Sequence, residues 1–248
     1  MSKKYKGKLC VYCARAESTS ADHVVAREFF LEKYREGLPK VPACERCNSE
    51  KSVLEHYLTS VLPFGGKHPD ALVNLATMVP KRLQKNLRLR EELRREFAQG
   101  RRNIGLSDVN MNTLPSAIPI NHIPLENLFA MMAKGLAWHH WRFTLGTGYS
   151  ATAAILSDHG KRIVDEYLFA LNARNRVAEN IGGNAFAYEG LQAKDDPKLT
   201  LWRFSIYGGV SFGGGDDPRM AGQVGSQIIA VTGPEMLLAR LSTSISRS

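Results

Sequence analysis

The chain has 248 residues, of which 44% are hydrophobic, and a formal net charge of +9 at pH 7. This length and apolar content are sufficient for a packed core, whereas no run approaches the ~18 apolar residues of a membrane span. The basic N-terminus is not followed by the apolar segment of a secretory signal, so we expect a cytoplasmic globular protein with no membrane partner. The positive charge favours a polyanion, such as nucleic acid, as the partner.

The first part of the chain holds all four cysteines, in the pairs Cys10-x-x-Cys13 and Cys44-x-x-Cys47. A reducing compartment argues against disulfides, and four thiolates in two such pairs suit tetrahedral zinc (Zn²⁺). Because four thiolates leave no coordination position open for water or substrate, the pattern predicts a structural zinc. The alternative interpretation is four buried thiols that bind no metal.

Helical periodicity starts at the second cysteine pair. Residues 44–62 carry one apolar stripe and end at Pro63, and residues 70–100 are predicted to be helical again, with a kink or restart at Pro80. Nine basic residues against three acidic ones lie between positions 81 and 102. We expect this basic excess to contact phosphates; the alternative is a solvated helix face carrying ion pairs.

The last part of the chain mixes two periodicities, after a connection rich in Pro, Asn and Ser over residues 101–124. Helices are predicted over residues 125–143 and 160–175, and strands over residues 184–191, 199–214 and 225–233. Within the first of these helices, His139 and His140 lie between two tryptophans, which indicates either a partly buried aromatic patch or a surface that stacks on bases.

The predicted fold class is therefore α+β, in three parts. These are an N-terminal zinc domain over residues 1–62, a basic helical region over residues 63–110, and a C-terminal domain over residues 111–248 with a small antiparallel sheet and helices. We expect the C-terminal domain to select the substrate, to form a homo-oligomer or to bind a regulatory partner.

Further polar residues accompany the cysteines: Asp22 and His23 lie between the two pairs, and Asn48 and Lys51 follow the second. With these residues the sequence resembles the HNH endonuclease superfamily in its zinc-stabilised treble-clef, or ββα-metal, form. The resemblance covers about the first sixty residues. The matching positions, in order, are Cys10, Cys13, Asp22, His23, Pro42, Cys44, Cys47, Asn48 and Lys51.

The resemblance implies metal-dependent hydrolysis of phosphodiester bonds, most directly of double-stranded DNA, in a setting such as bacterial defence or a mobile element. It assigns His23 as the general base that activates water, because a neutral imidazole can accept a proton near pH 7. Asp22 and Asn48 become ligands of a catalytic Mg²⁺ or Mn²⁺, and Lys51 a phosphate contact. The further expected phosphate contacts are Arg27, Arg46, Lys81, Arg82, Lys85 and Arg88.

One feature departs from the superfamily pattern. Residues 34–44, with the sequence YREGLPKVPAC, lack the middle asparagine that braces the catalytic histidine. Either another group or a backbone carbonyl braces His23, or the active loop is less well ordered than is usual in the superfamily. Each residue also has an ordinary alternative role: Asp22 as a cap, His23 as a buried histidine and Lys51 as a solvated helix residue. The alternative function is a non-catalytic treble-clef module that binds nucleic acid or a protein.

Overall fold

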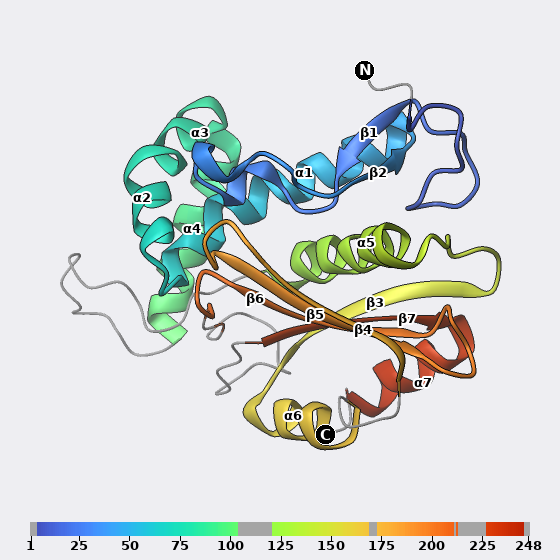
Figure 1. Cartoon of the computed structure of the whole chain (residues 1–248). Helices are drawn as coiled ribbons and strands as arrows, with labels where there is room; N and C mark the ends of the chain where they lie inside the picture. The colour runs from blue at the N-terminus through green and yellow to red at the C-terminus, as the bar shows by residue number, and fades with distance from the viewer. Residues whose placement is uncertain (1–3, 104–120, 169–172, 211, 213–226, 246–248) are drawn as a thin grey trace.

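The structure is a computed structural model that describes residues 4–103, 121–168, 173–210, 212 and 227–245. Over these residues the chain is a mixed α+β protein with one two-stranded and one five-stranded sheet, both antiparallel, which confirms the predicted fold class at this level. Helix α5 lies between the N-terminal elements and the large sheet (Figure 1). Among the described helices, none has both the length and the apolar character that crossing a lipid bilayer requires.

The N-terminal part is a loop bearing the first cysteine pair, a short hairpin and a long helix. Its elements are β1 (Ser20–His23), the 3₁₀ turns Arg27–Phe29 and Glu32–Tyr34, β2 (Lys40–Ala43) and α1 (Glu45–Val61). Strands β1 and β2 pair so that His23 lies opposite Lys40, and Cys44 is the N-cap of α1. The helix predicted over residues 44–62 is confirmed to within one residue at each end.

Three helices follow a 3₁₀ turn at Leu62–Gly65: α2 (Pro69–Thr77), α3 (Val79–Lys85) and α4 (Leu87–Asn103). The restart predicted at Pro80 is confirmed, since this residue occupies the first turn of α3, where a missing backbone N–H is tolerated. A second break occurs at Asn86, whose side-chain oxygen accepts a hydrogen bond from the Leu89 backbone N–H and so caps α4.

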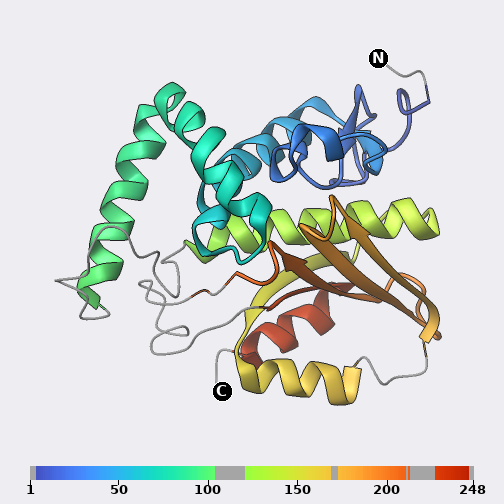
Figure 2. The same ribbon diagram turned by 60° about the vertical axis from the view of Figure 1, so that its left-hand side comes forward.

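The C-terminal part is a five-stranded sheet in the order β3-β7-β6-β5-β4, with α5 on one face and α6 and α7 on the other (Figures 1 and 2). Its strands are β3 (Tyr149–Leu156), β4 (Ala173–Ile181), β5 (Phe186–Ala193), β6 (Thr200–Ile206) and β7 (Gln227–Pro234). Its helices are α5 (His122–Trp141), α6 (Asp158–Ile163), a π-helical turn (Val164–Leu168) and α7 (Glu235–Ile245).

The three predicted strands correspond to β5, β6 and β7. The helix predicted over residues 160–175 is wrong at its end, because Ala173–Asn175 already belong to β4, and residues 169–172 lie outside the described part. Strands β3 and β4 and helix α7 were not predicted. Most of the predicted connection at residues 101–124 also lies outside the described residues.

Helix α5 is the centre of the hydrophobic core. Toward the sheet, its Phe129 ring meets Phe204 edge-on, with centroids 5.0 Å apart. Toward the N-terminal hairpin it packs through Gly135, where an added Cβ would lie 2.8 Å from a methyl group of Val24. The three predicted domains thus contribute to one continuous core, and the division between them stays a prediction.

Candidate functional site

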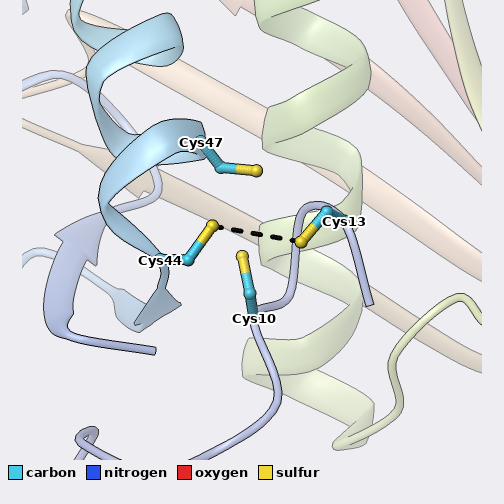
Figure 3. Close-up of side chains that lie close together, drawn as sticks. All are labelled: Cys10, Cys13, Cys44 and Cys47. Carbon is cyan, nitrogen blue, oxygen red and sulfur yellow. Dashed lines mark hydrogen bonds between the residues drawn. The ribbon is translucent and has the colours of Figure 1, made fainter. Parts of the chain in front are cut away.

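The four cysteine sulfurs converge between the loop that carries Cys10 and Cys13 and the start of α1, which carries Cys44 and Cys47 (Figure 3). All four Sγ atoms lie within 4.8 Å of one another, and those of Cys13 and Cys44 are 4.0 Å apart. Tetrahedral zinc with Zn–S bonds of about 2.3 Å requires S···S separations of about 3.8 Å. The four thiols therefore fit a zinc ion, and no other such cluster of three or more Cys, His, Asp or Glu occurs among the described residues.

Local backbone geometry prepares the first cysteine pair for a metal. The chain turns sharply after Cys13 because Ala14 adopts a left-handed conformation, with φ of 51°, and donates its N–H to the Cys10 carbonyl. Burial opposes ionisation of the Cys13 thiol, but hydrogen bonds from the backbone of Ala16 and Arg15 outweigh it and lower the pKa to about 6. The thiolate form of Cys13, which is the form that binds metal, is thereby favoured at neutral pH, whereas burial raises the pKa of the Cys10 and Cys47 thiols.

A lysine from α5 adjoins the cysteine cluster. The Lys134 Nζ donates a hydrogen bond of 3.1 Å to the Tyr12 carbonyl, within the first cysteine pair. Burial lowers the pKa of Lys134, while the sulfurs of Cys47 and Cys13 act in the opposite direction. The C-terminal part thus places a cation beside a set of thiolates that would carry net negative charge around zinc.

We predict that Lys134→Met weakens zinc binding by roughly tenfold, because loss of a group that supports metal ligands typically costs 10- to 100-fold in affinity. Competition with a chromophoric chelator measures this change. Lys85→Met, on the exposed face of α3, removes the same charge at a distance and serves as the control. Equal zinc affinity in Lys134→Met and Lys85→Met would show that the Lys134 charge does not offset the negative charge of the thiolates around zinc.

Lys51 organises a buried polar network next to the hairpin. Its side chain has no exposed surface, and its Nζ lies 3.0 Å from Asp22 Oδ2, 2.7 Å from the His23 carbonyl oxygen and in contact with the Glu55 carboxylate. Tyr12 donates its hydroxyl proton to the same Asp22 oxygen at 2.5 Å. With three acceptors around one buried ammonium group, Lys51 does not reach solvent, and this arrangement does not support its predicted role as a phosphate contact.

The network holds the backbone at the end of β1. Lys51 fixes the carbonyl of His23, and the next residue, Val24, donates its N–H to the Pro39 carbonyl at 2.9 Å. A side-chain cation and a backbone carbonyl therefore fix the chain at His23 and Val24.

Sequence reasoning missed two members of this network, Tyr12 and Glu55. Burial raises the pKa of Glu55 to about 7, although the nearby Lys51 charge opposes the shift. The only available signal was the i,i+4 spacing of Lys51 and Glu55 on one helix, which is common on solvated helix surfaces. Tyr12 gave no signal, because the Cys-x-x-Cys spacing by itself assigns no role to the two residues between the cysteines.

His23 and Asp22 point to opposite sides of β1, as consecutive strand residues do. Asp22 is 8% exposed and faces α1, whereas His23 is half-buried. Burial lowers the pKa of His23, and the positive charges of Lys40 and Arg27 lower it further, while Asp22 acts in the opposite direction. The lowered pKa favours the neutral form of the imidazole.

Asn48 lies on the same side of β1 as Asp22, where its amide nitrogen approaches the Ser20 hydroxyl at 3.3 Å. Ser20 and Asp22 are two residues apart in the strand and share a face. The structure thus brings Asp22, Asn48 and Lys51 to one interface between β1 and α1, with His23 on the other face of the strand.

The predicted phosphate contacts have several different environments. Arg27 is exposed, and Arg46, also exposed, lies 3.6 Å from Glu50. Arg82 is instead a structural bridge, since its guanidinium donates to the carbonyls of Thr59 and Glu28. Lys81, Lys85 and Arg88 are exposed, and Arg88 pairs with Glu92.

The helices α3 and α4, which carry the basic residues from Lys81 onward, lie beyond the C-terminal end of α1 (Figures 1 and 2). The hairpin flanks the other end of that helix. The turn that follows β1 nevertheless reaches α3, since the Arg82 guanidinium donates to the carbonyl of Glu28, next to Arg27.

Comparison of the chain with protein-family models, with curated proteins and with solved structures gave no match in any of the three.

Proposed function

We propose that the chain is a metal-dependent endonuclease of the HNH type, with a treble-clef zinc centre that orders the active hairpin. The observation that carries this proposal is the setting of His23: a neutral imidazole at the end of β1, with its backbone held by Lys51 and with Lys40 and Arg27 close enough to lower its pKa. The order of loop, hairpin and helix around paired cysteines supports the treble-clef assignment.

In this proposal His23 accepts a proton from the water that attacks phosphorus. The cationic neighbours Lys40 and Arg27 attract the phosphate backbone of DNA, and the exposed basic residues of α3 and α4 contact it further along. Asp22 and Asn48 would hold Mg²⁺ or Mn²⁺, because in the described structure no hydrogen bond engages the Oδ1 atom of either residue, and such oxygens suit hard cations. Both residues lie on the face of β1 opposite to His23, so the proposal requires the phosphate to lie at the edge of the strand, where it can contact the ion and the imidazole together. When bound, that ion supplies charge stabilisation at the phosphate.

A second candidate function, a non-catalytic module that binds nucleic acid or a protein, is favoured by the surroundings of Asp22. This carboxylate is nearly buried and already bonded to Tyr12 and Lys51. Such a network stabilises the hairpin whether or not the chain hydrolyses anything. The two functions differ in whether His23 is required for turnover.

The deciding experiment is cleavage of a plasmid in the presence of Mg²⁺ or Mn²⁺. We expect His23→Ala to reduce the cleavage rate by roughly 10²- to 10⁴-fold, the usual contribution of a general base. His122→Ala is a matched control, because this half-buried histidine begins α5, about 20 Å along the helix from Gly135, which contacts Val24 next to His23. It should cleave at the wild-type rate.

Zinc content and circular dichroism of both variants must match those of the wild type, so that loss of folding is not mistaken for loss of catalysis. Equal rates in wild type and His23→Ala, with DNA binding retained, would reject the nuclease and leave the binding module. Absence of cleavage by the wild type, His23→Ala and His122→Ala alike would also reject a nuclease that acts on plasmid DNA.

A further inference from the structure

A pocket of about 440 Å³ opens at one end of the large sheet, beyond the point where α5 stops covering it. The helix ends at Trp141 because Arg142 takes a left-handed conformation, with φ of 59°. Trp141, Phe143 and Tyr149 give the pocket an aromatic lining, and Gln192 lies in its wall. Trp141 is also packed on Trp202 of β6, with ring centroids 5.0 Å apart, which fixes one wall against the sheet.

A β-bulge places an arginine in this pocket. In the pairing of β4 with β5, Ala173 lies opposite Ala193 and Asn175 opposite Gln192, so Arg174 is an extra residue without a partner in the ladder. Bulges re-aim a side chain away from the regular alternation of the strand and are frequent at functional sites. Arg174 lines the pocket, is exposed, and makes no hydrogen bond or ion pair with the residues that the structure describes.

Most of the other polar groups of the pocket bond to one another. The Asn175 amide donates to Gln192 Oε1 at 2.6 Å, and the Gln192 amide donates to the Pro197 carbonyl at 2.7 Å. Asp196 accepts from the Tyr149 hydroxyl at 3.1 Å and from the Lys198 backbone N–H at 2.9 Å. The amides of Asn175 and Gln192 and the carboxylate of Asp196 already bond to other groups of the pocket, so they are poorly placed to form base-specific hydrogen bonds with a ligand.

The groups that remain are aromatic rings and two cations. Lys198 holds its ammonium group 5.0 Å from the centroid of the Tyr149 ring, and Arg174 lies at the bulge. A ligand that satisfies both features has a flat aromatic part and an anionic part. A nucleotide unit has this chemistry, since its base stacks on aromatic rings without regard to sequence and its phosphate pairs with arginine and lysine.

We propose that this pocket binds a nucleotide unit, base and phosphate together, without selecting among bases. The unit can come from a free mononucleotide or from an unpaired position in a nucleic acid strand. The inference does not depend on the endonuclease activity, because neither His23 nor the cysteine cluster contributes to the pocket.

The test is titration of the zinc-loaded full chain with AMP and with CMP, followed by tryptophan fluorescence, since Trp141 lines the pocket. Mononucleotides contain no phosphodiester bond, so hydrolysis cannot interfere. We expect both to bind, and Arg174→Ala to weaken both by roughly tenfold through loss of a charge-assisted pair. Arg176→Ala, an exposed arginine on the same strand that does not line the pocket, is the control and should bind as the wild type does.

Lys198→Ala is a second variant, which keeps the test decisive if Arg174→Ala folds poorly. Failure of AMP and CMP to bind, equal loss in Arg174→Ala and Arg176→Ala, or strong preference for one base would overturn the proposal. If a single-stranded oligonucleotide displaces AMP at a lower concentration than its duplex form does, the natural ligand is an unpaired position in a nucleic acid strand. Displacement by neither form identifies a free nucleotide.

Discussion

Cys47→Ala is expected to abolish zinc binding and to unfold the N-terminal hairpin. Strands β1 and β2 have only four residues each, too few to be stable without a fixed partner. Structural zinc contributes about 10–16 kcal/mol of apparent binding free energy, comparable to the about 5–15 kcal/mol that stabilise a whole domain. Hydrogen exchange of the variant should therefore show loss of amide protection in β1, β2 and the first turn of α1. Elemental analysis should find less than one zinc ion per chain.

The control for this prediction is Ser52→Ala, an exposed position on the same helix, which should retain zinc and protection. Treatment of the wild type with a strong chelator should reproduce the effect of Cys47→Ala, and addition of zinc should reverse it. A Cys47→Ala chain with full zinc content and wild-type exchange would show that the four thiols are buried without a metal.

The second large effect is expected from Lys51→Met. This change keeps the length of the side chain but leaves the Asp22 and Glu55 carboxylates without their shared cation. Removing one partner of a buried ion pair typically costs about 3–5 kcal/mol, because the remaining charge stays buried and unpaired. Urea denaturation at pH 7.5 should show a loss of this size in the free energy of unfolding.

Lys85→Met, at an exposed position, is the matched control and should change stability by less than about 0.5 kcal/mol. The double variant Lys51→Met/Glu55→Gln should recover part of the loss, because it removes one of the two stranded carboxylates. If Lys51→Met is as stable as the wild type, the network contributes nothing to folding.

The same network gives the fold a pH dependence of definite sign. Because burial raises the pKa of Glu55 from 4.5 to about 7, the folded chain binds this proton more tightly than the unfolded chain. The resulting stability is fully present below pH 4.5 and is lost as the pH rises through 7. Glutamine does not titrate, so Glu55→Gln should not lose this contribution. Between pH 5.5 and pH 8.5 the unfolding free energy of the wild type should therefore fall relative to that of Glu55→Gln.

The sequence predicts the elements that carry a strong local signal. Helix α1 was predictable from its apolar stripe and from Pro63, and the cysteine cluster from the spacing of its pairs. Strand β4 was not, because it is a sheet edge with most residues exposed and so lacks the alternation that marks a half-buried strand. Strand β3 is rich in alanine, which has low strand propensity, and its pairing with β7 is fixed only by residues far along the chain.

For the site, the residue types were predictable but their environments were not. The sequence identifies Lys51 as a cation near Asp22, yet its complete burial depends on how β1, the cysteine loop and α1 pack together. Nothing local indicates that Lys134, more than a hundred residues later, supplies a charge to the cysteine loop. Long-range packing decides which charged side chains meet solvent and which serve the fold.

The position of α5 has a consequence for how the molecule responds to disturbance. One helix touches Val24 through Gly135, the cysteine loop through Lys134 and the sheet through Phe129. Because these contacts are direct, the hairpin and the sheet pack on the same helix, and loosening either one exposes apolar surface of α5. Melting should accordingly proceed as one cooperative transition rather than as separate events at the two ends of the chain.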